Sequence, residues 1–561
     1  MPASRPFKWV YIALWLIRVC FALFGTGYIH PDEHMQNGEI AAGDILGLHA
    51  LKSWEWHPAS PVRSIVPAFV TTGVPILFFK LFGSERLATN VQVSMLFRIE
   101  RLAFLNLSML LDYSLLSLIS SPAHQRLGLL LLASSYVMHT FQVRPFSNSL
   151  ESVLVALCLV LFQRIVVDGL TPLNGGGKDA DDSASKRGRT FKRDLHLLAI
   201  LGVVGTFTRP TFLAFALPIA YQVLLFSCRV AGSPIRAVAL LLPPLCSAAL
   251  AASGFIVADT YYFRGNFSNP VITPYNFVQY NLSAENLADH GLHPRWLHLS
   301  VNLPMMVGPG LLWFTLCSIY EYAKHYGRSS EGDPVGMDTI RQTIIQMILH
   351  SLLILSVQPH QELRFLTPLV LPIIVLAATL KRSARPGKLF WASRTFSASW
   401  ITFNVLLALV FGFLHQGGVV PSLFSLRATL DDVSSGMSTH IIYWKTYMPP
   451  RHLLGVSQKD VLSGKISLTD LAGASQDALK AAFSTPSCDA TYLVTPMAMY
   501  LSLPEEIVSC TALQKRIFPH LDLDHISETV QAGWYDGLSL GIYAVKRSCT
   551  ADGPTTGASL K

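Results

Sequence analysis

The sequence predicts a mainly helical protein that crosses a membrane many times and carries loops and a small mixed unit on one side. Two observations predict this fold class. Of the 561 residues, 51% are hydrophobic and only 14% are charged, whereas soluble proteins carry about 25% charged residues. The mean hydropathy is +0.40, and apolar runs of membrane-crossing length recur along the chain. We therefore expect a polytopic bundle of about 11–13 transmembrane helices.

The charge balance and the cysteines exclude other classes of protein. A net charge of +8 favours nucleic-acid binding in a soluble protein, but here the basic residues lie in short loops beside apolar runs, where they indicate topology and contact with anionic lipids. No RNA-reading motif is present, so no nucleic-acid partner is expected. The eight cysteines show neither a CxxC nor a zinc spacing. Cys488, Cys510 and Cys549 lie in the polar C-terminal part, where two can pair outside the cytosol, and the odd count leaves the pairing open.

Twelve apolar segments are candidate spans, each close to or somewhat shorter than the roughly 20 residues that cross a bilayer. In order, they are Phe7–Gly25, Ser64–Phe82, Leu102–Ile119, Leu127–Phe141, Ser149–Val167, Leu195–Phe207, Thr211–Phe226, Ala237–Val257, Leu303–Tyr320, Ile344–Val357, Phe365–Leu380 and Ile401–Leu414. Arg5 and Lys8 precede the first span, which predicts a cytosolic N-terminus. A cleaved signal peptide is the alternative for this segment, but no clean cleavage site follows it.

The loops are assigned by their charge. Residues 26–63 and 259–300 are polar and are expected on the far side of the membrane, and the second of them carries the glycosylation sequons at Asn266 and Asn281. The glycine-rich, charged stretch 170–194 is expected to be a flexible cytosolic loop. Four spans separate residues 26–63 from this loop, which places both on the same side, so that either one span is re-entrant or the basic loop lies on the far side.

The chain divides into two predicted domains. Residues 1–414 are expected to form a transmembrane catalytic domain. Residues 415–561 have lower hydropathy and mix helical stretches with short alternating runs, which predicts a small soluble domain on the same side as residues 26–63.

The first candidate site is the stretch His30–His34 (His-Pro-Asp-Glu-His), where the first span leaves the membrane. Charged residues at this depth are costly unless they are solvated or functional, so Asp32 and Glu33 are candidate catalytic carboxylates. An alternative is structural, because acidic residues in the first turn after Pro31 stabilise a helix dipole. Another is zinc, because His30, Glu33 and His34 match an H-x-x-E-H pattern. The proline inside the pattern and the lack of a distal ligand weaken that hypothesis.

Two further charged turns lie between spans. His360, Glu362 and Arg364 occupy one short turn, which indicates an anion site because arginine binds phosphate through two hydrogen bonds. The alternative is interfacial anchoring with an internal salt bridge.

The other turn contains Arg144, Asn148 and Glu151, and its alternative interpretation is a helix start capped by Asn148. Arg209 is a further charge at the junction of two apolar runs, where a snorkelling side chain is the alternative.

Three stretches together resemble the motif set of a known enzyme family. They are His30-Pro31-Asp32-Glu33-His34, Phe146-Ser147-Asn148-Ser149-Leu150-Glu151 and His360-Gln361-Glu362-Leu363-Arg364-Phe365-Leu366. In this order on a chain with many spans, they resemble the Alg9-like mannosyltransferases, glycosyltransferase family 22. The resemblance runs from the first span to about Pro372. It implies a GT-C type membrane fold, dolichyl-phosphate mannose as the donor, no further cofactor and no obligatory metal, and an active site at the lumenal face of the endoplasmic reticulum (ER) membrane.

The third motif narrows the resemblance within the family. Many members have H-K-E-E-R-F there, whereas this chain has Gln361 and Leu363. Together with Tyr28–His34, this resembles the branch that adds the fourth mannose to the glycosylphosphatidylinositol (GPI) precursor, although Met35 stands where that branch has an aromatic residue. Another ER mannosyltransferase, which adds the third GPI mannose or extends a lipid-linked oligosaccharide, is an alternative. A membrane transporter is a remote one, because its charges are expected near the membrane midplane.

The resemblance also implies roles for the charged residues in an inverting hexosyl transfer. Asp32 is the expected base, and Glu33 is the expected second carboxylate or orienting group. The donor phosphate is expected to be held by a set of four residues, namely His360, Glu362, Arg364 and Arg209. Residues expected to bind substrate or shape the site are His30, His34, Arg144, Asn148 and Glu151.

Overall fold

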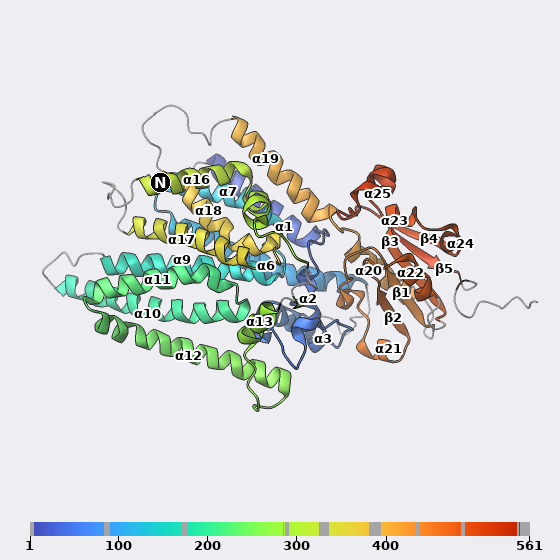
Figure 1. Ribbon diagram of the computed structural model, residues 1–561, viewed down its shortest axis with the longest axis horizontal. Helices are drawn as coiled ribbons and strands as arrows, with labels where there is room; N and C mark the ends of the chain where they lie inside the picture. The colour runs from blue at the N-terminus through green and yellow to red at the C-terminus, as the bar shows by residue number, and fades with distance from the viewer. Residues whose placement is uncertain are drawn as a thin grey trace, which may run out of the picture.

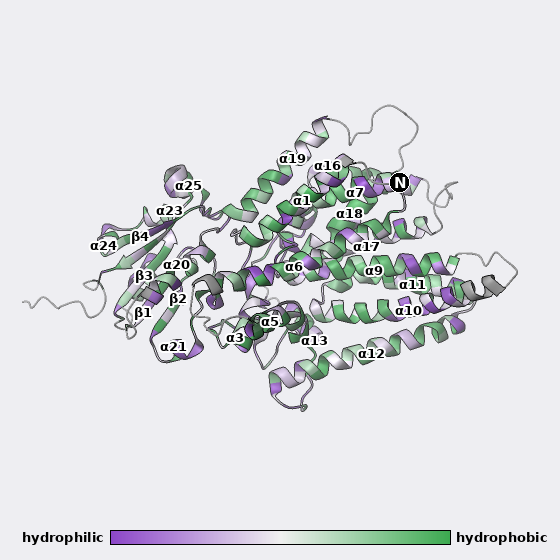
Figure 2. Cartoon of the chain, turned by 180° about the vertical axis from the view of Figure 1, so that it is seen from behind, coloured by the Kyte–Doolittle hydropathy of each residue, from purple (hydrophilic) through white to green (hydrophobic). Residues whose placement is uncertain are grey.

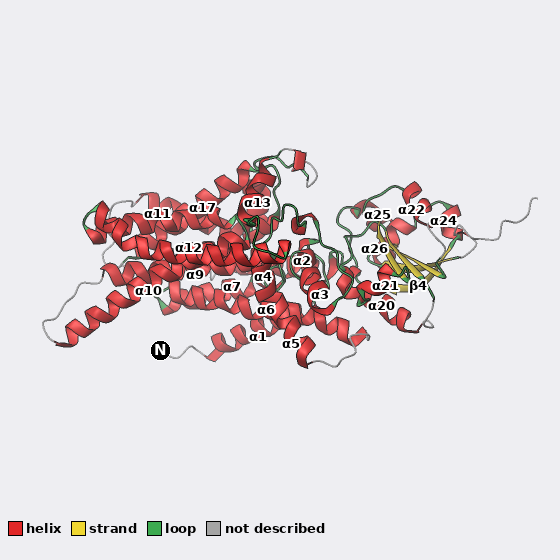
Figure 3. Cartoon of the chain, turned by 90° about the horizontal axis from the view of Figure 1, so that it is seen from below, coloured by secondary structure: helices red, strands yellow, loops and turns green. Residues whose placement is uncertain are grey.

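The computed structural model describes residues 5–82, 90–170, 178–283, 285–286, 291–324, 336–380, 394–432, 437–483, 488–546 and 549 (Figure 1). It shows a long helical bundle with a small α/β unit at one end of it, and all strands lie in that unit (Figure 3). The bundle helices are mostly hydrophobic along their length (Figure 2). The predicted mainly helical, multi-pass membrane fold with a small mixed C-terminal unit is therefore confirmed.

Long helices make up most of the bundle. They are α1 (Arg5–Phe24), α6 (Asn90–Leu118), α9 (Ser147–Leu170), α10 (Lys178–Thr208), α11 (Phe212–Ala231), α12 (Pro234–Arg264), α16 (Pro309–Lys324), α17 (Met337–Val357) and α19 (Arg394–Leu409). Shorter segments complete it, namely α7 (Pro122–Ser134), α8 (Tyr136–His139), η3 (His298–Asn302), α15 (Leu303–Val307), η4 (Leu363–Leu369), α18 (Val370–Ala378) and η6 (Val410–Leu414). Helix α9 lies at the centre, because most of its side chains are buried in the main hydrophobic core.

Within the described residues, eight helices are long and apolar enough to cross a membrane, or nine if the bent pair His298–Val307 and Pro309–Lys324 is one span. This is fewer than the expected 11–13. Three of the expected spans fall on helical segments whose apolar part is short: α7 has 13 residues, α18 has nine, and α10 is charged in its first half.

One expected span does not cross the bundle. Residues 65–82 form α4 (Ile65–Ala68), η2 (Phe69–Gly73) and α5 (Val74–Phe82). Before this segment, Ser64 Oγ donates to Asp259 Oδ1 near the end of α12 (2.9 Å), and at its end Lys80 Nζ donates to the Ile45 carbonyl in the loop of residues 26–63 (2.5 Å). Both ends therefore lie on the same side, as a re-entrant segment requires. Removing this crossing places residues 26–63 and the start of α10 on opposite sides.

The charged stretch 170–194, expected to be a flexible loop, is helical from Lys178 onward. Side-chain contacts attach it to α9: Thr190 Oγ1 donates to Asp168 Oδ2 (2.8 Å), and Arg164 pairs with Asp194 (2.9 Å). These contacts with the long helix α9 explain why the stretch is helical and not the expected flexible loop. Residues 171–177, which include the three glycines, and the basic stretch 381–385 lie outside the described residues.

The C-terminal unit is built on a five-stranded sheet, with strand order β2-β1-β3-β5-β4. The strands are β1 (Thr439–Tyr443), β2 (Ile466–Asp470), β3 (Ala490–Pro496), β4 (Thr511–Ile517) and β5 (Leu540–Val545). Strand β1 is parallel to β2 and β3, and β5 is antiparallel to β3 and β4. The helices around the sheet are α20 (Val419–Asp432), η7 (Arg451–Leu454), α21 (Gln458–Leu462), α22 (Gln476–Phe483), α23 (Met497–Tyr500), α24 (Glu505–Ser509), α25 (Ile526–Gln531) and α26 (Gly533–Gly537).

A disulfide settles the cysteine pairing that the sequence left open. Cys510 and Cys549 are bonded, whereas Cys488 is free. Cys510 immediately precedes β4 and Cys549 follows β5, so the antiparallel pairing of these strands brings the two residues together. Disulfides are typical of proteins in oxidising compartments.

The C-terminal unit packs against the end of the bundle that holds residues 26–63. Tyr28 and Val93 of the bundle share a hydrophobic cluster with Val419 and Leu453 of the C-terminal unit. The Tyr28 hydroxyl also donates to the Met448 carbonyl (2.9 Å). The loop in between contains α2 (Asp32–Met35), α3 (Gly38–Leu46) and η1 (Trp54–Trp56), and α13 (Thr273–Leu282) lies on the same side.

Candidate active site

A cavity of about 540 Å³ lies at this end of the bundle, between the loop of residues 26–63, the junction of α10 and α11, α13, α17 and η4. Charged and polar side chains that line it include His30, Asp32, Glu55, Arg63, Arg209, His360, Glu362 and Arg364. Leu213, Leu217 and Ile354 belong to an apolar side. Six residues expected from the sequence therefore meet in one cavity, although they come from three distant parts of the chain.

Asp32 lies at the start of α2, where the turn after Pro31 directs its side chain into the cavity. The side chain is 23% exposed, and its Oδ2 lies 2.7 Å from Arg364 Nη1. The same oxygen accepts a hydrogen bond from Gln36 Nε2 (2.5 Å). The other oxygen, Oδ1, lies 3.6 Å from His30 Nδ1. Asp32 thus has one oxygen fixed by the protein and one available to a substrate.

The surroundings of Asp32 favour its ionised form. Burial by itself raises the pKa of this carboxyl, but the Arg364 guanidinium, with a smaller contribution from His30, holds the pKa below its ordinary value. Asp32 is therefore a carboxylate at neutral pH and is able to accept a proton.

Glu33 faces away from the cavity, which corrects its expected role as a second catalytic carboxylate. Its side chain is fully buried between two arginines: it contacts Arg101, and Arg144 Nη1 donates to its Oε2 (2.8 Å). Burial raises the pKa of Glu33, but Arg144 and Arg101 outweigh it and lower the pKa to about 2. Arg144 also donates to the Gly27 carbonyl. Glu33 and Arg144 therefore hold the loop in place and do not reach a substrate in the cavity.

Glu362 joins three cationic or polar neighbours beside Asp32. It accepts hydrogen bonds from Arg364 Nη2 (2.8 Å) and His360 Nε2 (2.7 Å), and His30 Nε2 lies 3.6 Å from its Oε2. Burial raises the pKa of Glu362, and Arg364 and His30 more than reverse this, so that the pKa lies well below its ordinary value. Arg364 therefore bridges two carboxylates, Asp32 and Glu362, and its charge is already neutralised.

Arg209 is the cavity cation with the least compensated charge. Only 4% of it is exposed, and within the described residues no carboxylate lies within ion-pair distance of its guanidinium. Its Nε donates to Thr211 Oγ1 (2.9 Å) and its Nη1 to Ser147 Oγ (3.3 Å). Burial and the nearby Arg63 lower its pKa to about 10, so it remains charged at neutral pH. A buried cation with neutral partners and a cavity in front of it favours an anionic ligand.

Glu151 and Asn148 support Arg209 from behind and do not line the cavity. Thr211 Oγ1 donates to Glu151 Oε1 (2.8 Å), and Asn148 Nδ2 donates to Glu151 Oε2 (3.1 Å). Asn148 lies inside α9 and makes this contact, so it does not cap the helix. Their expected role in shaping the site is compatible with these positions.

The zinc hypothesis for His30, Glu33 and His34 is wrong. Glu33 is held by two arginines, and His30 lies in the cavity wall beside Glu362. His34 is 1% exposed, lies outside the cavity, and packs against Phe97. The helical turn sends the three side chains in different directions, and they have no common centre.

Four residues that the sequence analysis did not single out complete the site. Gln36 links Asp32 to Ser147, because Ser147 Oγ donates to Gln36 Oε1 (2.8 Å). Ser147 Oγ also accepts from Arg63 Nη1 (3.2 Å), and Arg63 pairs with Glu55 (2.7 Å). Arg63 immediately precedes an apolar run, and a charge at such a position could have marked it as a candidate site residue.

Residues 9–454 match the Alg9-like mannosyltransferase family. The chain belongs to this family. It is a mannosyltransferase, so the family prediction is confirmed and the alternative of a membrane transporter is wrong.

Curated relatives extend over most of the chain. The GPI mannosyltransferase 4 of Emericella nidulans is 31% identical over 522 residues, which cover 89% of this chain and 85% of that protein. The GPI alpha-1,2-mannosyltransferase 4 of Homo sapiens is 32% identical over 567 residues, with 94% and 92% covered. The GPI mannosyltransferase 4 of Schizosaccharomyces pombe is 29% identical, with 97% and 96% covered.

Solved structures give weaker likenesses. ArnT from Cupriavidus metallidurans in the apo state superposes with a TM-score of 0.49 at 11% identity, covering 98% of this chain and 99% of that chain. The oligosaccharyltransferase AglB from Archaeoglobus fulgidus gives a TM-score of 0.40 at 11% identity, with 89% and 70% covered.

Proposed function

We propose that this protein transfers mannose from dolichyl-phosphate mannose to the third mannose of the trimannosyl GPI precursor, in α-1,2 linkage, at the lumenal face of the ER membrane. Relatives named GPI mannosyltransferase 4 over most of the chain support the acceptor. The observation that carries the mechanism is the cavity itself, where an ionised Asp32 and the uncompensated Arg209 face the same space.

The cavity suits both the polyprenyl chain and the phosphate of the donor. Leu213, Leu217 and Ile354 line the cavity and yet are 41%, 49% and 44% exposed on helices of membrane-crossing length. The cavity is therefore open toward the hydrocarbon of the bilayer between α11 and α17, as a polyprenyl chain requires. Arg209 lies where the apolar side ends, and there it binds the phosphate of the donor.

The acceptor glycan has an aromatic surface available. Trp54 of η1 stacks on Tyr280 of α13, with ring centroids 4.0 Å apart and an angle of 17° between the planes. Both residues line the cavity, and Trp54 is 41% exposed. Broad aromatic faces with a few placed polar groups are typical of ligand sites. We assign this pair to the acceptor sugar and the opposite polar wall to the reacting groups.

The transfer is an inverting single displacement. Asp32 takes the proton of the acceptor 2-hydroxyl while that oxygen bonds to the anomeric carbon of the donor mannose. The bond from this carbon to the phosphate oxygen breaks, its electron pair stays on that oxygen, and Arg209 stabilises the departing dolichyl phosphate. A positioned base contributes about 10²–10⁴-fold to such a reaction, and a preorganised cation at the leaving group adds a contribution of about 10²–10³-fold.

Two measurements test the proposed function. Depletion of the protein in its host should cause a GPI intermediate with three mannoses to accumulate. Purified protein, given dolichyl-phosphate mannose and trimannosyl GPI, should form a product whose new mannose is removed by an α-1,2-specific mannosidase. Transfer to a dimannosyl GPI or to a lipid-linked oligosaccharide in place of trimannosyl GPI would show that the acceptor is a different one.

A further inference from the structure

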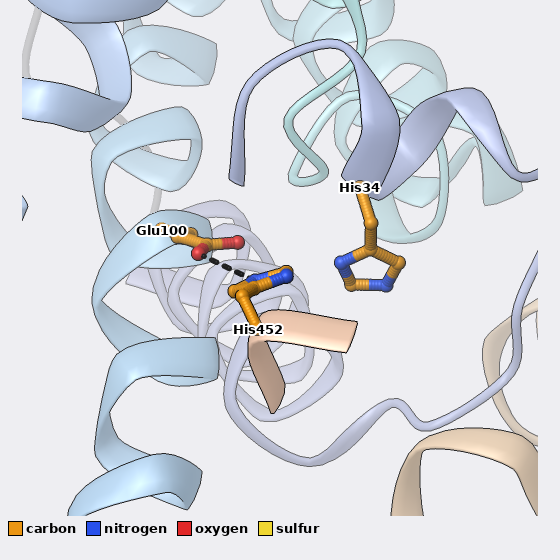
Figure 4. A group of neighbouring side chains, drawn as sticks. All are labelled: His34, Glu100 and His452. Carbon is orange, nitrogen blue, oxygen red and sulfur yellow. Dashed lines mark hydrogen bonds and ion pairs between the residues drawn. The ribbon is translucent and has the colours of Figure 1, made fainter. Parts of the chain in front are cut away.

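We propose that His34, Glu100 and His452 form a zinc site that fastens the C-terminal unit to the catalytic loop. The three residues come from α2, α6 and η7, and their side chains converge at one point (Figure 4). Each offers one ligand atom, and these atoms lie within 4.8 Å of one another. All three residues are at most 1% exposed. None of them lines the cavity, so the site is structural and separate from the reaction.

His34 is the strongest indication that a ligand belongs here. Neither of its ring nitrogens has a hydrogen-bond partner, although the residue is 1% exposed. Leaving a buried polar group without a partner costs about 1–3 kcal/mol. Nε2 lies on the side of Glu33, 3.8 Å from its Oε1, and the opposite edge of the ring, with Nδ1, faces His452 (Figure 4). A metal ion at this point supplies the missing partner.

His452 has the environment of a metal-binding histidine. Its Nε2 lies 3.2 Å from Glu100 Oε1, a separation compatible with two ligand atoms on one ion. Its other nitrogen, Nδ1, lies 3.5 Å from Glu39 Oε1. Glu39 is itself fixed by the backbone N–H groups of Arg451 and Leu51. Nδ1 has no hydrogen-bond partner in the described residues, so Glu39 is the carboxylate placed nearest to support this histidine as a zinc ligand.

Gly38 lies directly against these ligands. A Cβ at this position would lie 2.8 Å from Glu100 Oε2, closer than such atoms approach in proteins, and 3.0 Å from His452 Nε2, which is an unusually tight contact. Glycine at this position is therefore explained by close approach to the ligand atoms.

The ligand chemistry selects zinc. Two imidazoles and one carboxylate suit Zn²⁺, whereas Mg²⁺ and Ca²⁺ prefer sets of oxygen ligands. An ion held by α2 and η7 fixes the position of Asp32, which lies two residues before His34, relative to the C-terminal unit. The competing occupant is a proton, which would make His452 an imidazolium ion paired with Glu100 and Glu39.

Metal analysis of the purified full-length chain separates these occupants. We expect about one equivalent of zinc per chain after removal of any affinity tag and loosely bound metal. His34→Phe keeps a ring against Phe97 and should lose at least about 80% of the zinc, and Glu100→Gln should do the same. His139→Phe is the matched control, because His139 is also buried with an unpartnered ring nitrogen, and it should retain the zinc.

Three outcomes would overturn the zinc site. They are wild-type protein without zinc, equal zinc in wild type and His34→Phe, and equal loss in His139→Phe.

Measurements on protein that carries the native ligands keep the test valid if the ligand variants misfold. A chelator should lower the midpoint of thermal unfolding of the wild-type protein, since an ion that binds only the folded state stabilises it. X-ray absorption at the zinc edge should show imidazole scattering and no sulfur ligand. Gly38→Ala should reduce the zinc content without removing a ligand. An unchanged unfolding midpoint after chelation, or a sulfur-containing zinc shell, would contradict the site.

Discussion

Glu33→Gln is expected to destabilise the protein, because Glu33 is a structural anion. Its side chain is fully buried, and the two arginines that it pairs with are each 1% exposed. Without its charge, Arg101 retains the Gly25 carbonyl and Arg144 retains the Gly27 and Phe411 carbonyls. Removing one partner of a buried ion pair costs about 3–5 kcal/mol, out of a total folding free energy of about 5–15 kcal/mol.

Asp32→Asn is the matched control for this experiment. Asp32 is 23% exposed, and its partner Arg364 keeps the carboxylate of Glu362. Both variants replace a carboxylate by its amide at neighbouring positions, so the difference between them reports the environment of each. Thermal unfolding followed by fluorescence-detected size-exclusion chromatography in detergent should show a large decrease for Glu33→Gln and a small change for Asp32→Asn.

The pH dependence has a defined sign. The pKa of Glu33 is lowered to about 2 in the folded protein, so its contribution to stability is complete above the ordinary pKa of a glutamate. That contribution is lost progressively as the pH falls from the ordinary pKa of a glutamate through about 2. A Glu33→Gln variant that is as heat-stable as the wild type but inactive would refute the structural role of Glu33 and would indicate a catalytic role instead.

Three further predictions concern the donor, the base and the topology. Arg209→Gln should raise KM for dolichyl-phosphate mannose by about 10–100-fold, since a hydrogen bond to a charged group contributes about 1.5–3 kcal/mol. KM for the acceptor should change little, and equal effects on both substrates would contradict a phosphate role for Arg209. Arg364→Gln should raise the pKa of Asp32, whose depression it causes, so the acidic limb of the kcat/KM profile should move to higher pH; an unmoved limb would show that another group titrates. Asn266 lies in an exposed turn after α12, so endoglycosidase treatment should lower the apparent mass of the wild-type protein on a gel, and Asn266→Gln should carry one glycan fewer than the wild type. Access of a cytosolic probe to this turn would contradict the lumenal assignment.

Much of the active site was predictable because the charged residues stand out in an apolar chain. Asp32, Arg209 and the pair Glu362 and Arg364 lie in three separate loops between spans, and the expectation that such loops meet on one face is correct. The cost of placing charge near a membrane makes each of these residues conspicuous.

The different roles of Asp32 and Glu33, one facing the cavity and the other buried, were not predictable from the sequence. Consecutive residues on a helix point about 100° apart, so one of them faces the cavity and the other faces the protein. Which one is buried depends on Arg101 and Arg144, which come from distant parts of the chain. Local sequence carries no information about these partners.

The segment of residues 65–82 shows the same limit at the level of topology. Its hydropathy is that of a true span. Hydropathy, however, reports an apolar surface and does not report on which side of the membrane the two ends lie. The contacts of Ser64 with Asp259 and of Lys80 with Ile45 decide the question. Likewise, three cysteines left the disulfide open until the pairing of β4 with β5 brought Cys510 and Cys549 together.

The most direct test of the account is the initial rate of mannose transfer by purified Asp32→Asn protein. The donor is labelled dolichyl-phosphate mannose, the acceptor is trimannosyl GPI, and the rate is compared with that of the same amount of folded wild-type enzyme. Loss of the general base predicts a decrease in kcat of about 10²–10⁴-fold with KM for both substrates little changed. A variant whose kcat stays within about tenfold of the wild type would show that Asp32 is not the base.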